Sequence, residues 1–274
     1  MIKIKNVLII ITVIILVVVL LYIGRGDKLE EPVFVKELVS SEDMDVDIEF
    51  FVSNKSDLKV VDVEIPNMPN GFSLDFYDDV DEVNGCYGHW LSIEFSADDL
   101  SDSGGLSEPF VFHEIIIKWD DESETRANIG TVHLAESYEP SDTFEWYGTE
   151  YVNLPAVRQE VVQEFTATQD LSISKIDIPY YDEVSDYIKD ITLDGRNVFE
   201  ITEENPLVVE KGKTYIMNYI EDTSVPIKYG FVFLEGKIIG IDKHGNEHTN
   251  MFYIQARDGR DMIDVLHEAI KYAE

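Results

Sequence analysis

The chain has 274 residues, of which 55 are acidic and 21 basic, giving a formal net charge of −34 at pH 7. Such a charge repels nucleic acid, so we expect no nucleic-acid partner. Hydrophobic residues make up 45% of the chain, which is typical of a folded protein and not of a disordered one. Cys86 is the single cysteine, so no intramolecular disulfide can form and stability must come from hydrophobic cores.

An apolar run from Val7 to Gly24 is long enough to cross a membrane as a helix. Lys3 and Lys5 precede it without any acidic residue, which predicts a cytoplasmic N-terminus and an extracellular remainder. We therefore predict a cytoplasmic tail (1–6), a transmembrane signal anchor (7–24) and a linker (25–32). The alternative is a cleaved signal peptide, but the run is long and does not end in an A-x-A-like pattern of small residues. An exported chain without disulfides favours a bacterial, single-pass protein of the cell membrane.

Residues 33–138 show the alternation and turn signals of a first β-sandwich module. Apolar and polar residues alternate in short segments that are rich in Val, Ile and Phe. The expected strands are 33–38, 46–53, 58–65, 73–77, 90–95, 109–119 and 128–134. About seven short strands in this length is typical of an immunoglobulin-like sandwich.

Residues 139–155 are predicted to form a linker, because Pro140 and Pro155 flank them. The linker is rich in aromatic residues. We interpret these side chains as packing at the junction of two modules, with an exposed ligand platform as the alternative.

Residues 156–274 are predicted to form a second β-sandwich module. Its expected strands are 157–167, 171–178, 190–193, 206–209, 214–220, 228–234, 238–241 and 251–255, with a helical turn in 181–189 and a hairpin around Lys243–Asn246. The apolar spacing of Met262–Tyr272 predicts a short C-terminal helix that docks on this module.

Two pairs of segments resemble each other at similar separations. The motif at 57–66 returns at 170–179, and Phe110-Val111-Phe112 returns at 231–233. We interpret them as traces of a tandem duplication, which would place Ile65 on Ile178 and Phe112 on Phe233. The predicted fold is all-β, with two tandem immunoglobulin-like sandwiches behind a transmembrane helix and a short α-helix at the end.

Acidic residues crowd the segment around Asp78, Asp79 and Asp81. Carboxylate oxygens in one loop suit Ca²⁺, so these three are the candidate cation ligands, although the spacing does not match a helical calcium loop. No other cofactor is expected. A solvated acidic face and a docking face for a basic partner are the alternatives.

The sequence contains no catalytic constellation. Motifs for nucleotide binding, zinc proteolysis and the serine nucleophile are absent. His244 and His248 lie across a predicted hairpin tip, and Cys86 is expected to be a small residue at the start of a strand. We therefore assign no catalytic or cofactor-binding residues.

We expect a membrane-anchored, non-enzymatic protein with an interaction or structural role at the cell envelope. A basic protein or an envelope polymer would be its partner. Two alternatives remain: an enzyme or enzyme accessory acting on envelope polymers, and the ectodomain of a membrane sensor.

Overall fold

The computed structural model describes residues 31–41, 45–53, 58–69, 72–83, 86–97, 108–135, 141–154, 158–222, 224–225 and 228–257. Within them the protein is almost entirely β-strand, which confirms the all-β prediction. No helix among these residues has the length and apolar character that a membrane crossing needs. The predicted anchor (7–24) and the predicted helix Met262–Tyr272 lie outside the described residues.

Strands β1 to β8 form a first strand group. Their bounds are β1 (Val33–Phe34), β2 (Glu37–Ser41), β3 (Asp45–Ser53), β4 (Val60–Glu64), β5 (Phe72–Val83), β6 (Cys86–Ala97), β7 (Phe110–Trp119) and β8 (Glu124–Leu134). One sheet has the order β1-β3-β6-β5, and facing it are β4, β7, β8 and β2 of an eight-stranded sheet.

Strands β9 to β17 form a second strand group. Their bounds, with those of two short helices, are β9 (Phe144–Leu154), β10 (Arg158–Ala167), β11 (Leu171–Asp177), α2 (Tyr181–Val184), β12 (Ile188–Leu193), β13 (Arg196–Asn197), η1 (Val198–Glu200), β14 (Leu207–Val209), β15 (Thr214–Asp222), β16 (Phe231–Ile241) and β17 (Glu247–Arg257). One sheet of this group has the order β13-β12-β15-β10-β9. The second layer consists of β14, β11, β16 and β17, which are the remaining strands of the eight-stranded sheet.

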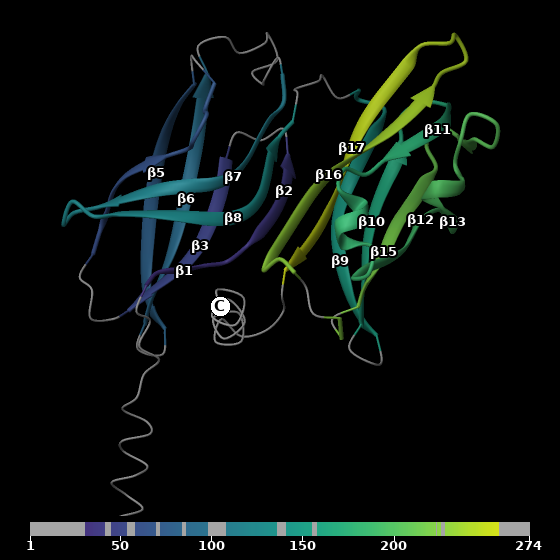
Figure 1. Cartoon of the computed structure of the whole chain (residues 1–274). Helices are drawn as coiled ribbons and strands as arrows, with labels where there is room; N and C mark the ends of the chain where they lie inside the picture. The colour runs from purple at the N-terminus through teal and green to yellow at the C-terminus, as the bar shows by residue number, and fades with distance from the viewer. Residues whose placement is uncertain are drawn as a thin grey trace, which may run out of the picture.

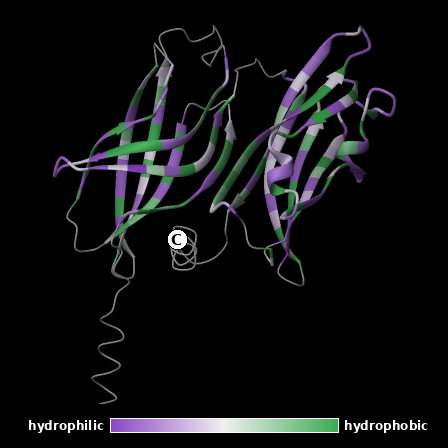
Figure 2. Ribbon diagram, viewed as in Figure 1, coloured by the Kyte–Doolittle hydropathy of each residue, from purple (hydrophilic) through white to green (hydrophobic). Residues whose placement is uncertain are grey.

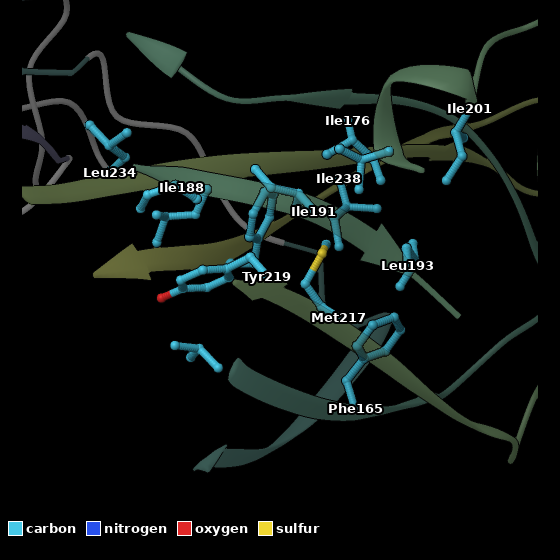
Figure 3. Packing of buried hydrophobic residues seen from close by; sticks show 14 of the residues in the cluster. Phe165, Ile176, Ile188, Ile191, Leu193, Ile201, Met217, Tyr219, Leu234 and Ile238 are labelled. Atoms are coloured by element: carbon cyan, nitrogen blue, oxygen red, sulfur yellow. The ribbon is translucent and has the colours of Figure 1, made fainter. Parts of the chain in front are cut away.

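Each strand group has its own hydrophobic core between two layers. Hydrophobic and hydrophilic residues alternate along the strands, as half-buried sheets require (Figure 2). The first core includes Phe50, Ile93 and Trp119. In the second core, Phe165, Met217 and Tyr219 pack against Ile188 and Ile191 (Figure 3).

The pairing register of the first group is repeated in the second. Nine β3–β6 pairs, from Asp45↔Glu94 to Ser53↔Cys86, return as nine β10–β15 pairs, from Arg158↔Asp222 to Thr166↔Thr214. The separations are 158 − 45 = 113 and 222 − 94 = 128 residues. The register shift between Val60 and Asp62 of β4 also returns 113 residues later, between Ile173 and Lys175 of β11. Ile65 and Ile178 directly follow these two strands, as the predicted repeat requires.

The second predicted pair falls on corresponding strands, but the two side chains point in different directions relative to their own strand groups. Phe112 lies in β7 and Phe233 in the corresponding β16, but Phe112 points into the core of its own group whereas Phe233 packs against the core of the other. The β7–β8 pairing has a register shift between Phe112 and Glu114, and β16–β17 has none. One extra residue in a strand reverses which side chains face inward.

Strand β2 joins the two groups into one body. It pairs in parallel with β8 on one side and with β16 on the other, and in Figure 1 it lies between the two groups. Leu38 belongs to the core of the second group, and its neighbour Val39 to the core of the first. Although β16 belongs to the second group, its Phe231 and Phe233 side chains pack against the core of the first group. We call this junction, made by β2, β8 and the first half of β16, the seam.

A glycine makes the seam possible. Gly130 of β8 has φ +97°, and a Cβ atom added to it would lie 2.1 Å from the backbone oxygen of Glu37 in β2. Glycine tolerates this backbone conformation and leaves room for the neighbouring strand.

Two predicted loops are strands. Within the predicted linker 139–155, residues 144–154 form β9 and pair with β10. The acidic segment expected to be a loop is part of β5, where alternation turns Asp79 and Asp81 to solvent and Asp78 to the opposite side of the strand. The two strands expected at 228–234 and 238–241 are one strand, β16. The expected hairpin at Lys243–Asn246 is confirmed, as is the helical turn, which is α2.

Candidate functional site

The outer surface of the β1-β3-β6-β5 sheet carries carboxylates without any basic residue. The register places Asp45 opposite Glu94 and Glu94 opposite Asp75, so that three acids form a row across β3, β6 and β5. Strands β3, β5 and β6 contain no Lys or Arg. We call this surface the acidic face; its carboxylates are Asp45, Asp47, Glu49, Asp75, Asp79, Asp81 and Glu94.

The corresponding surface of the second group has mixed charge. Arg158 takes the place of Asp45, and Asp222 takes that of Glu94, so that the same position of the ladder holds an ion pair with a nitrogen–oxygen distance of 3.7 Å. Lys189 approaches Asp222 as well, at 3.4 Å. Like charges directly opposite each other destabilise a sheet, and opposite charges stabilise it. The acidic row is therefore a property of the first group and is not required by the fold.

Two aromatic side chains interrupt the acidic face. Tyr77 of β5 is 69% exposed. Trp90 of β6 is half-buried and donates its indole N–H to the Glu49 carboxylate at 3.1 Å. An exposed tyrosine surrounded by carboxylates can stack on a cationic or aromatic group of a partner. The face thus offers negative charge and a ring side by side.

The three predicted cation ligands do not converge. Asp79 and Asp81 belong to the acidic face, whereas Asp78 points to the other side of β5, where its carboxylate bonds the Nδ1 atom of His89 at 2.9 Å. Alternating side chains of one strand cannot surround one ion. Among the described residues there is no group of three or more His, Cys, Asp or Glu side chains placed to hold a metal.

His89, considered from the sequence only as a base near the Cys86 thiol, is a buried polar residue of the first group. It is 2% exposed, stacks on Phe50 with ring centroids 4.6 Å apart, and meets the edge of Trp119. Its Nε2 atom has no hydrogen-bond partner within the described residues. The hydrogen bond to Asp78 compensates part of the cost of burying this ring.

The other candidates from the sequence have structural roles. Cys86 is buried at the start of β6, as expected. His248 is 3.4 Å from the carboxylate of Asp242, which also accepts the backbone N–H groups of His244 and Asn246. Hydrogen bonds from Asn246 and His244 hold the pKa of Asp242 well below its usual range. The carboxylate therefore organises the β16–β17 turn.

A strongly perturbed carboxyl group lies in the second core. Glu221 of β15 is 3% exposed, and burial raises its pKa to about 7. The sequence contained a signal for it, since Tyr215, Met217 and Tyr219 are buried at the alternate positions before it. Alternation along β15 turns the Glu221 side chain toward the inside of the second group.

Comparisons with known proteins assign no family to the chain. No family model and no curated protein matches it. Among solved structures, a protein of unknown function from Porphyromonas gingivalis W83 is 13% identical, with 80% of this chain and 94% of that one covered and a TM-score of 0.25. The CupB2 chaperone of Pseudomonas aeruginosa is also 13% identical, with 78% and 95% covered and a TM-score of 0.22. Similarity at these TM-scores carries no argument about fold or function.

Proposed function

We propose that the protein is a membrane-anchored, extracellular and non-enzymatic protein that uses its acidic face to bind a basic partner at the cell envelope. The anchor is the apolar run 7–24, and the exported part consists of two tandem immunoglobulin-like modules followed by a short C-terminal helix. The repeated strand order and register support the tandem arrangement.

The observation that carries the proposal is the contrast between two equivalent surfaces of one chain. A sheet that needs only charge balance could use ion pairs, as the second group does with Arg158 and Asp222. The first group instead places Asp45, Glu94 and Asp75 side by side. Mutual repulsion in that row costs stability, and a basic partner would relieve it.

The seam supports an interaction role as well. Because β2 pairs with both β8 and β16, the acidic face is fixed relative to the second group. A preorganised surface loses less entropy on binding than a mobile one.

The test is site-specific photocrosslinking in intact cells. A photoreactive amino acid replaces Tyr77 on the acidic face, and in a control protein it replaces Ile216, which is 40% exposed on the corresponding sheet of the second group. We expect a basic protein to be crosslinked from position 77 and not from position 216. Crosslinking should fall when Asp75 and Asp79 become Asn.

Two results would contradict the proposal. One is equal crosslinking from both positions. The other is a partner retained after the two aspartates are neutralised, because binding would then not depend on charge.

Topology is tested separately with protease added to intact cells. Lys3 and Lys5 before the apolar run predict that residues beyond the anchor lie outside. We expect external protease to digest the two strand groups in intact cells. Digestion only after lysis would reverse the orientation.

A further inference from the structure

Glu221 occupies a position where the first strand group has an ordinary core residue. The nine-pair ladder relates residue 93 of β6 to residue 221 of β15, since 93 + 128 = 221. Residue 93 is an isoleucine with 0% exposure. The fold thus accepts an apolar side chain here, and the second group buries a carboxyl group instead.

The surroundings of Glu221 do not compensate its charge. Its neighbours across the sheet are Ile188 of β12 and Gln159 of β10. From β16 and β17 of the opposite sheet, the hydrophobic side chains in this core are Val232, Leu234, Ile238, Phe252, Ile254 and Ala256, while the buried Asn250 of β17 donates to the Thr143 hydroxyl. No hydrogen bond or ion pair in the described part of the chain reaches the Glu221 carboxyl group, and burial alone perturbs it.

Among the described residues, the titratable and charged groups near this end of the sandwich form no ion pair with Glu221. They come from β15 itself, from β9, β10 and β12, and from the residue before β12: Tyr219, Asp222, Tyr151, Arg158, Lys189 and Tyr187. Both bases approach the carboxylate of Asp222. The Ser224 hydroxyl and Lys189 hold the pKa of Asp222 below its usual range.

We propose that Glu221 is a pH-sensitive latch at this end of the second strand group. When its carboxyl group is neutral, the two sheets close over it. When the group is ionised, it draws in water and the ends of β15 and β17 separate. Tyr219 links these strands, because its hydroxyl group donates to the backbone oxygen of Gln255 and accepts the N–H of the same residue.

The direction of the response follows from proton linkage. Burial raises the pKa of Glu221 from the ordinary 4.5 to about 7, so the closed form binds the proton more tightly than the open form. The closed form is therefore fully favoured below about pH 4.5, and it loses stability as the pH rises to about 7. Between these two pH values the equilibrium constant for opening increases by up to about tenfold per pH unit.

The test is hydrogen exchange of the Gln255 amide in the full-length protein in detergent, because that N–H bonds Tyr219 at 3.1 Å. Protection factors, corrected for the intrinsic pH dependence of exchange, are compared at pH 5 and pH 8. We expect wild-type protection to fall by a factor on the order of one hundred. In Glu221→Gln and in Glu221→Ile, which copies Ile93, the fall should be less than about threefold.

The matched control is Glu164→Gln, which removes an exposed carboxylate from the same sheet. It should retain the wild-type response and so account for the general effect of net charge. The latch is refuted if wild-type protection is the same at both pH values. It is also refuted if either variant of Glu221 keeps the full response.

Discussion

Asp45 and Arg158 occupy the same place in the two strand groups, and the difference between them can be measured. Asp45 faces Glu94, whereas Arg158 faces Asp222 and pairs with it. We expect Asp45→Arg to stabilise the protein by about 0.5 to 1 kcal/mol, since it replaces repulsion by attraction on an exposed sheet surface. Urea denaturation at low salt measures this gain. Asp45→Asn is the control and should give about half of it, and the gain should shrink at 1 M salt.

Whether a given residue's role can be predicted depends on whether it follows from local alternation. The expected strand 214–220 is confirmed as part of β15, but it ends one residue before Glu221, so the burial of this carboxyl group was not predicted. The hydrogen bond between Asp78 and His89 depends on the register of β5 with β6. That register is set by pairing between strands, so the sequence alone does not show that Asp78 lies on one face of β5 and Asp79 and Asp81 on the other.

At the scale of elements, the seam depends on the close approach of β2 to β8. Gly130→Ala places a methyl group against the backbone of Glu37 at a positive φ, so either β2 or β8 must move. We expect a loss of about 2 to 4 kcal/mol in unfolding free energy. The control is Gly212→Ala, at φ +79° with open space around the added atom, which should cost about 1 kcal/mol. Equal losses in the two variants would mean that the close approach of β2 and β8 contributes nothing to the unfolding free energy.

The edge of β17 is protected differently from the edge of β8. Strand β2 covers β8, but side chains from the opposite sheet cover β17: Gln163 donates to the Tyr253 oxygen at 2.6 Å, and Tyr219 bonds the backbone of Gln255. Ser141 exchanges hydrogen bonds with Thr249. An uncovered edge strand invites pairing with another chain, so these contacts close a site of aggregation.

Elements whose partners are near in sequence were predictable, and those with distant partners were not. The hairpin of β16 and β17 follows from its turn residues. The pairing of Glu37–Ser40 with Phe231–Leu234 joins segments almost 200 residues apart, and nothing local in β2 predicts it. Strand β9 was missed because Pro140 and Pro155 at its flanks indicated a linker, although its own residues suit a strand.

At the scale of the molecule, charge repulsion opposes the folding of the first strand group more strongly than that of the second. Residues 25–140 contain seven basic and 29 acidic residues, a net of −22, and residues 141–274 contain twelve and 26, a net of −14. Folding brings these charges together, and in the first group it places seven of the carboxylates on one sheet surface without a basic residue. The ion pairs of Asp222 relieve the same repulsion in the second group.

Monovalent salt should therefore raise the melting temperature of the protein, and the first group should respond more strongly. Raising the salt from 0.01 M to 0.1 M shortens the Debye length from roughly 30 Å to about 10 Å, which screens the carboxylates from one another. Hydrogen exchange of β3 and β6, compared with β10 and β15, separates the two groups within one intact chain.

Calcium chloride and sodium chloride at matched ionic strength then distinguish screening from specific binding, because a bound ion stabilises by mass action. Because Asp78 points away from Asp79 and Asp81, we expect equal effects of the two salts. An additional gain in calcium that disappears when these three aspartates become Asn would instead reveal a site. An unchanged melting temperature in both salts would show that the carboxylates are far enough apart for their repulsion to be negligible.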